Sequence, residues 1–216
     1  MLSILPTDIY SGKVKIGIGL DPDTIHSGFA AVLAFEGKYI PFAWGILGES
    51  ITDSKIPIVN SVHRQVITLM QALSTTESYP GSRQHINIAV ESQEVYAGGL
   101  TRNPRDLLPL AQVAGALLGV SMQYRHFATF KFPKPAEWKG QVPKNIHHNR
   151  IASKLDIPIE AKKTYTKPTE EGERRLEAMA MSLPANLNLR KFSTQVKGPQ
   201  WSEVLDAFGL AIWAAS

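Results

Sequence analysis

The chain has 216 residues and a mass of 23.8 kDa, which is typical of one domain with its own hydrophobic core. Its 44% hydrophobic and 19% charged residues exclude a disordered or fibrous protein, and the lack of cysteine excludes a disulfide scaffold, a thiolate zinc site and a cysteine nucleophile. The net charge of +4 is a mild basic excess, compatible with a nucleic-acid partner but not sufficient to identify one.

The sequence gives no sign of a membrane or secretory segment. No stretch approaches the roughly 18 apolar residues that a spanning helix needs. The opening MLSILPTDIY lacks a basic region, and Pro6 and Asp8 interrupt its apolar run, so we expect no signal peptide. We therefore expect a soluble, cytoplasmic protein with no membrane partner.

The first half of the chain predicts three strands in a meander, then a helix and a fourth strand. The first strand is rich in β-branched residues and ends at Asp21, and Glu36-Gly37 forms the turn between the second and third. The helix has apolar residues at helical spacing. In chain order these elements are residues 14–20, 28–35, 39–47, the helix 57–73 and the strand 86–90.

The second half predicts mainly helices. A helix rich in small residues over 107–118 precedes a fifth strand over 122–130. The segment KFPKPAEWKGQVPK, with three prolines and four lysines, predicts a basic loop. Two helices and an irregular stretch follow, and the last helix begins near Ser202, a natural N-cap. The two helices cover 145–155 and 170–182, and the irregular stretch covers 186–200.

The order of these elements predicts an α/β fold. Three strands, then helices alternating with two more strands, form a five-stranded mixed sheet with an antiparallel meander and helices on both faces. We expect a single domain over residues 1–216.

Four acidic residues occupy positions where a carboxylate is costly to bury. Asp21 and Glu91 each end a strand with a buried pattern, while Glu203 and Asp206 share one face of a final helix that is apolar nearly all round. Carboxylates gathered in this way repel one another and lose hydration unless a cation neutralises them, and hard divalent ions prefer oxygen ligands. The pattern predicts a two-metal site suited to phosphodiester cleavage.

Each acid also has a purely structural interpretation when it is taken alone. Asp21 before Pro22 is typical of a turn, and acids such as Glu203 and Asp206 in the first turn of a helix complement its macrodipole. The joint pattern of two strand-end acids and an acid pair on a terminal apolar helix favours the metal site.

Five segments resemble, in order, the motifs of RuvC-type Holliday junction resolvases. GIGLDPDTIHSGFA is similar to the first strand and hairpin of that family, and VESQEVYAGG resembles its second acidic motif, with Glu91 in the metal-binding place. LAQVAGALLG resembles the small-residue helix that follows, WKGQVPK the lysine-bearing segment near the scissile phosphate, and WSEVLDAFGLAIWA the last motif. The Pro-rich lysine segment is most similar to phage members of the family, which would act in the host cytoplasm.

The resemblance implies a ribonuclease H-like fold, in which about 156–200 is an insertion before the last catalytic helix. Two positions depart from the family pattern. Asp23 replaces the usual Gly after Asp-Pro, so we expect that turn to be built differently. Glu203 fills a place often held by Asp or His, which preserves metal binding but can alter the metal preference.

The resemblance also implies an activity: a metal-dependent, structure-selective DNA endonuclease that resolves four-way junctions by paired symmetric nicks as a homodimer. Two Mg²⁺ or Mn²⁺ ions per active site would activate water and stabilise the leaving 3′ oxygen. Lys139 and Lys144 would steady the phosphate as point charges, whereas without the resemblance a solvated basic loop is the preferred interpretation of both. The implied metal ligands are Asp21, Glu91, Glu203 and Asp206.

Further residues are candidates for contact with DNA or with a second subunit. Tyr96 lies where family members place an aromatic that stacks on an unpaired base, and simple packing is the alternative. The small-residue helix 107–118 either brings two backbones together in the dimer or packs on its own sheet. His147 and His148 are adjacent on a helix and diverge, so we expect no metal site from them. Basic residues that either widen the phosphate-binding surface or are ordinary surface charges are Arg102, Arg105, Lys131 and Lys134.

Three other functions compete with this interpretation. A sugar-kinase or actin-like ATPase of the same superfamily needs two such domains and a second phosphate loop, for which 216 residues are too few. A junction-binding module that does not cut would be supported by the loss of a metal acid, yet carboxylates fill all four places. A related nuclease acting on flaps or forks stays open.

Overall fold

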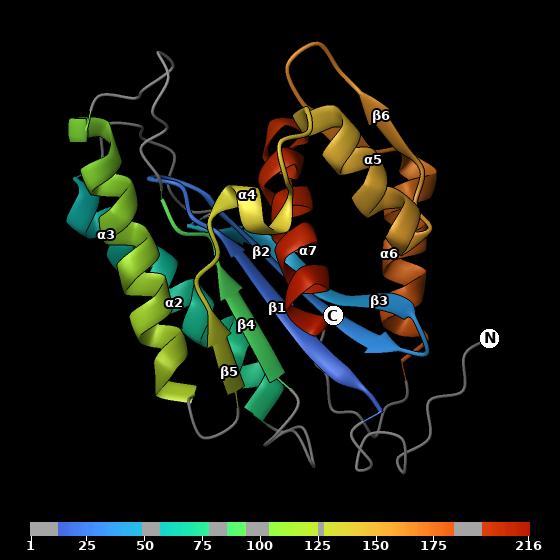
Figure 1. The fold of residues 1–216 in the computed structure, drawn as a ribbon, viewed down its shortest axis with the longest axis horizontal. Helices are drawn as coiled ribbons and strands as arrows, with labels where there is room; N and C mark the ends of the chain where they lie inside the picture. Colours follow the sequence, from blue (N-terminus) through green and yellow to red (C-terminus); the bar gives the residue numbers. More distant parts are fainter. Residues whose placement is uncertain (1–12, 49–56, 78–85, 94–103, 125–127, 184–195) are drawn as a thin grey trace.

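A five-stranded mixed sheet forms the centre of the computed structural model, which describes residues 13–48, 57–77, 86–93, 104–124, 128–183 and 196–216 (Figure 1). Its strand order is β3-β2-β1-β4-β5. The first three strands form an antiparallel meander, while β4 and β5 add in parallel beside β1. The strands are β1 (Lys15–Asp21), β2 (Ser27–Phe35), β3 (Lys38–Leu47), β4 (Ile86–Val90) and β5 (Ala128–Lys131). The predicted α/β class and five-stranded mixed sheet are confirmed.

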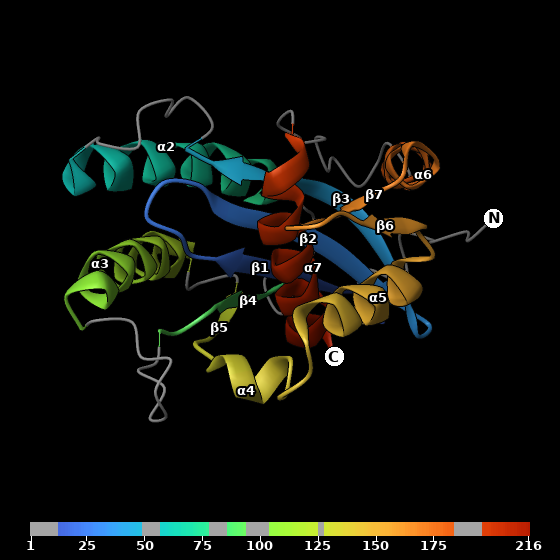
Figure 2. The ribbon, with the colours of Figure 1, turned by 90° about the horizontal axis from the view of Figure 1, so that it is seen from above.

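Helices cover both faces of this sheet, as predicted. Figure 2 shows α2 (Ile58–Glu77) and α3 (Pro104–Ser121) on one face, with α5 (Lys144–Leu155), α6 (Glu170–Met181) and α7 (Trp201–Ala215) on the other. Each face has its own hydrophobic core. The small-residue helix α3 packs on the sheet of its own chain, where Val113 and Leu117 are fully buried.

The alternation of side chains along β1 determines which of its residues lie on each face of the sheet. Successive side chains of a strand point to opposite faces, so Ile16, Ile18 and Leu20 enter the core beneath α2 and α3. Gly17 and Gly19 therefore face α7, and Asp21 continues their row. A Cβ on Gly17 would overlap the carbonyl oxygen of Ala211, and one on Gly19 would overlap that of Ala207. The glycines let the backbone of α7 lie directly on the sheet.

Three details of the second half differ from the sequence-based expectations. The fifth strand begins at Ala128 rather than near 122, because α3 continues to Ser121 and a 3₁₀ turn (Met122–Tyr124) follows it. The basic loop contains a one-turn helix, α4 (Pro135–Trp138). A small hairpin of β6 (Ile159–Ala161) and β7 (Thr166–Pro168), which was not predicted, precedes α6.

The remaining predicted helices agree with the structure to within a few residues. The predicted helix 170–182 corresponds to α6, whose N-cap Thr169 accepts a hydrogen bond from the amide of Gly172 at 3.1 Å. Of the stretch predicted to be irregular, 186–200, residues 186–195 lie outside the described residues, and a 3₁₀ turn (Gly198–Gln200) leads into α7. Within the described ranges, no helix combines the length and the hydropathy needed to cross a membrane.

The packing of α7 on β1 predicts that Gly19→Ala lowers the free energy of unfolding by about 3 kcal/mol, the upper end of ordinary overpacking costs. The added methyl group meets backbone, which cannot move without displacing the helix. Gly115→Ala in α3 is the matched control, because a Cβ there meets nothing within 4 Å and helix propensity favours alanine by about 1 kcal/mol. Urea unfolding followed by circular dichroism measures both changes. Equal midpoints for Gly19→Ala and wild type would contradict this account of the packing.

Candidate metal centre

Two of the four predicted acids meet because β1 and β4 are parallel neighbours. Leu20 pairs with Val90 in the ladder, so Asp21 and Glu91 are the next residues at the same edge of the sheet. The amide of Glu91 continues the pairing by donating to the carbonyl of Leu20 at 3.0 Å. Both residues are only 8% exposed, so their carboxylates lie in a largely dehydrated environment.

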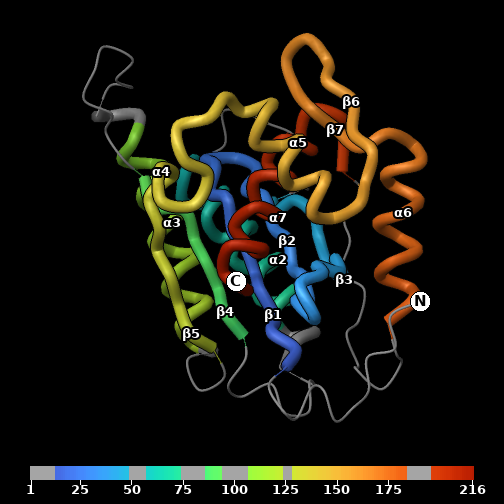
Figure 3. The backbone as a smooth tube through the Cα atoms, turned by 45° about the vertical axis from the view of Figure 1, so that its right-hand side comes forward, coloured from blue at the N-terminus to red at the C-terminus, as the bar shows by residue number. Residues whose placement is uncertain are grey.

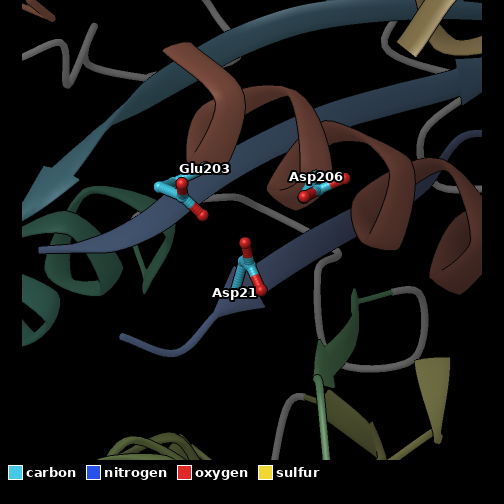
Figure 4. Close-up of side chains that lie close together, drawn as sticks. All are labelled: Asp21, Glu203 and Asp206. Carbon is cyan, nitrogen blue, oxygen red and sulfur yellow. The ribbon is translucent and has the colours of Figure 1, made fainter. Parts of the chain in front are cut away.

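The other two acids come from the first turns of α7. Gly28 pairs with Asp21 across β1 and β2, and a Cβ on Gly28 would overlap the carbonyl oxygen of Glu203. This close approach places Glu203 and Asp206 over the end of β1 (Figure 4). One carboxylate oxygen from each of Asp21, Glu203 and Asp206 lies within 4.8 Å of the others. We call these three residues the carboxylate group.

The turn after Asp21 is built by Asp23 rather than by glycine. The Asp23 carboxylate accepts hydrogen bonds from the amides of Ile25 at 2.9 Å and His26 at 3.2 Å, which is an Asx-type turn. From α2, the buried Gln65 donates to the carbonyl of Asp23 at 3.1 Å and accepts from the hydroxyl of Ser27. The departure from the family pattern therefore produces an ordered turn that is anchored to α2.

Glu91 lies beside the carboxylate group and is held by the basic segment. The indole of Trp138 donates to Glu91 Oε2 at 2.8 Å, and Lys139 Nζ lies 3.3 Å from the same oxygen. Figure 3 shows this segment, from β5 through α4 to α5, passing over the edge where β1 and β4 end. The amide of Ser92 donates to the carbonyl of Pro133 at 2.8 Å, which ties the segment to that edge.

Asp206 is held by α5 through both of its carboxylate oxygens. Lys144 Nζ lies 2.8 Å from Oδ2, and His148 Nε2 lies 3.1 Å from Oδ1. Lys144 and His148 are four residues apart, so they project from the same face of the helix. The Lys144 side chain is 53% exposed, whereas that of His148 is 1% exposed. Sequence analysis predicted that Lys144 steadies the phosphate, but it assigned no role to His148.

Burial and mutual repulsion shift the pKa values of these acids in different directions. Burial raises the pKa of Asp21 well above its ordinary value, and the charges of Asp206, Glu91 and Glu203 raise it further. Burial also raises the pKa of Glu91 against the opposing charge of Lys139. For Asp206, burial acts upward, but the hydrogen bond with His148 and the charge of Lys144 hold its pKa well below the ordinary value.

The two lysines stay protonated in this environment. Burial lowers the pKa of Lys139 and of Lys144, but the neighbouring carboxylates outweigh it, and the pKa of each is raised above its ordinary value. Among the described residues, no hydrogen-bond donor or ion-pair partner reaches the carboxylates of Asp21 and Glu203. Lys144 pairs with only one of the three acids, so the carboxylate group combines hard oxygen donors with negative charge that is only partly compensated, which fits a divalent cation.

Of the five other residues predicted to contact DNA, the structure describes the side chains of two. Tyr96 and Arg102 lie outside the described residues, and Arg105 is in the first turn of α3 without a described side chain. Lys131 ends β5 with its Nζ 4.7 Å from the centre of the Trp213 ring. Lys134 is exposed at the N-cap of α4.

Two residues that hold the site were not predicted from sequence. Trp138 and His148 contact Glu91 and Asp206 through ring nitrogens. His148 was considered only as a direct metal ligand, for which two adjacent histidines are a poor arrangement. The spacing of Lys144 and His148 was the available signal, since residues at i and i+4 share a helix face.

This sheet order, crossed by a helix whose first turns bring carboxylates to the end of the first strand, defines the ribonuclease H-like fold. Among solved structures, RuvC of Thermus thermophilus in complex with a Holliday junction substrate is similar to this chain. Its TM-score is 0.50 with 17% identity, over 91% of this chain and 90% of that one. A second Thermus thermophilus RuvC structure has a TM-score of 0.49 with 18% identity, over 76% of this chain and 92% of that one.

The similarity to RuvC is one of fold. No family model matches the sequence, and no curated protein matches it significantly. The RuvC-type resemblance inferred from the five sequence motifs is thus confirmed at the level of the fold.

The repulsion within the carboxylate group predicts that Asp21→Asn raises the thermal stability of the metal-free protein. The substitution removes a carboxyl group whose ionisation is disfavoured in the folded protein by burial and by the neighbouring acids. A gain of 1 kcal/mol corresponds to about 2–4 °C for a chain of this size. Asp23→Asn is the matched control, because it removes the same charge in the next turn, outside the carboxylate group. Calorimetry with chelator present measures both unfolding midpoints. A lower midpoint for Asp21→Asn than for wild type would contradict the prediction.

The stability difference between Asp21→Asn and wild type should also widen with pH in the metal-free protein. Above about pH 4 the unfolded chain releases the Asp21 proton, while the folded protein retains it because its pKa is raised. The wild type therefore loses stability relative to the variant as the pH rises toward that folded pKa. Urea midpoints between pH 4 and 8 measure the difference, and a constant difference would contradict the assignment.

Proposed function

We propose that this protein is a metal-dependent, structure-selective DNA endonuclease that resolves four-way junctions by paired symmetric nicks. The carboxylate group carries the proposal, because three acids are brought together at the end of β1 and only one of them, Asp206, is paired with a lysine among the described residues. The fold supports it, since the similar protein from Thermus thermophilus was solved with a Holliday junction substrate. The proposal treats residues 1–216 as one nuclease domain, with about 156–200 inserted before α7.

In this proposal the acids hold two Mg²⁺ or Mn²⁺ ions. Asp21, Glu203 and Asp206 would supply carboxylate oxygens that lie within 4.8 Å of one another, and Glu91 would supply a further carboxylate from the end of β4. When bound, such ions lower the pKa of water and stabilise charge on the leaving oxygen of a phosphodiester. The carboxylates fix the positions of both charges before the substrate arrives, because they belong to the sheet and to a helix packed directly on it.

The two lysines orient the scissile phosphate. Lys139 and Lys144 pair with Glu91 and Asp206 at the rim of the site, and both side chains retain solvent exposure. Their raised pKa values keep them charged at neutral pH, so they can bind phosphate oxygens as point charges. Beyond them, Lys131, Lys134, Arg102, Arg105 and Tyr96 remain candidates for DNA contact.

Paired cleavage needs two active sites on opposed strands. A single chain carries one carboxylate group within its described residues, so we propose that the protein works as a homodimer with two-fold symmetry. Flap or fork cleavage, and junction binding without cleavage, are the alternatives that the experiment must separate.

Purified protein incubated with labelled four-way, forked and linear DNA in Mg²⁺ or Mn²⁺ should nick the four-way substrate symmetrically. Asp21→Asn should slow cleavage by about a thousandfold, because metal ions supply several kcal/mol of transition-state stabilisation. Glu36→Gln is the control and should cut normally, because Glu36 is exposed in the turn between β2 and β3, near the start of β1 and away from the acids at its end.

Each alternative has its own outcome in this assay. Faster cutting of forked DNA would replace the junction assignment with a fork nuclease. Tight binding to the four-way junction without cleavage in either metal would contradict the nuclease proposal and support a junction-binding module.

A further inference from the structure

We propose that His148 is a positioning residue, which fixes the carboxylate of Asp206 in the orientation that metal binding requires. The proposal rests on the metal centre proposed above and deepens it by naming the residue that orders one of the ligands. His148 is contributed by α5, which lies outside the three segments that carry the four acids. Its role follows from where its ring lies, how it is buried and what else holds Asp206.

The contact itself is well defined. His148 Nε2 lies 3.1 Å from Asp206 Oδ1, and the two residues are 0% and 3% exposed. An ionised carboxylate only accepts hydrogen bonds, so the facing ring nitrogen donates. A charge-assisted hydrogen bond in a dehydrated place is among the stronger side-chain interactions.

A packing role alone does not explain an imidazole at this position. His148 Nδ1 is buried and has no hydrogen-bond partner in the described part of the chain. Burying a polar atom in this way is costly, and an apolar side chain of similar size would fill the space without that cost. The hydrogen bond from the ring to Asp206 offsets the cost of burying Nδ1.

The two oxygens of Asp206 are held by unequal partners. Lys144 contacts Oδ2 with a side chain that is 53% exposed, and its flexible four-carbon stem lets the ammonium group move away. His148 contacts Oδ1 with a ring that is enclosed on all sides. Oδ1 is therefore the fixed oxygen, and Oδ2 is the oxygen that becomes available to a cation when Lys144 moves away.

The neighbouring residue His147 lacks this arrangement and provides the matched control. It is also buried, but its Nε2 has no hydrogen-bond partner among the described residues, and its ring packs edge-on against Trp138 at 4.8 Å. A Cβ on Gly209 would lie 3.0 Å from that nitrogen, so the ring faces the backbone of α7. Burial lowers the pKa of His147 to about 4. His147 therefore contacts α7 and α4 but no acid of the site.

Mn²⁺ titration of the metal-free protein by calorimetry tests the proposal with His148→Asn, His148→Gln and His147→Asn. Glutamine places an amide nitrogen near the position of Nε2, whereas asparagine is one methylene too short. His148→Asn should weaken Mn²⁺ binding by about 10- to 100-fold, as expected for the loss of a partner that orients a metal ligand. His148→Gln should recover most of the affinity, and His147→Asn should bind Mn²⁺ like wild type.

The same variants give a second readout with four-way DNA. His148→Asn should lower kcat and leave KM unchanged, because DNA binding does not depend on the Asp206 orientation. Equal losses in all three variants, or wild-type Mn²⁺ affinity in His148→Asn, would overturn the positioning role. Altered Mn²⁺ affinity without cleavage of any branched DNA would instead contradict the nuclease proposal alone, and no Mn²⁺ binding by the wild type would overturn both.

Discussion

The direct contact between α7 and the first two strands is the constraint on which the rest of the molecule depends. Gly17, Gly19 and Gly28 remove the side chains that would separate the helix from the sheet. The helix backbone can then approach until carbonyl oxygens of α7 touch the strands. Because Asp21 belongs to the same row of β1, Glu203 and Asp206 come to lie over it. A side chain at any of these glycines would push α7 away from the sheet and so separate Glu203 and Asp206 from Asp21.

The assembled acids impose an electrostatic cost that the surrounding residues only partly offset. Lys139 and Trp138 stabilise Glu91, and Lys144 and His148 stabilise Asp206, so these two carboxylates are compensated within the chain. Asp21 is not, and burial with like charges raises its pKa. This distribution fits the proposed cation site, because the partners orient the carboxylates of Glu91 and Asp206 while the Asp21 carboxylate has no partner among the described residues. Stability is lowered at the place where function is proposed.

Much of this arrangement could be predicted from sequence because it depends on local patterns. Apolar runs rich in β-branched residues and the turn at Glu36-Gly37 predicted the first strands, and the apolar pattern of the last helix predicted α7. The four acids stood at recognisable strand and helix ends. The contacts of Trp138 and His148 could not be predicted, since they depend on how α4 and α5 dock on α7. The start of β5 was missed because the apolar pattern of α3 continues to Ser121, and the β6–β7 hairpin because its strands have only three residues each.

The most direct test of the account is a crystal structure of the wild-type protein with Mn²⁺, using anomalous scattering to locate the ions. The account predicts Mn²⁺ bound by Asp21, Glu203 and Asp206 at the end of β1, with Glu91 contributing to the same centre and Asp206 Oδ1 still bound to His148. Mn²⁺ peaks found only elsewhere on the protein, with the Asp21 carboxylate not among the ligands, would contradict it.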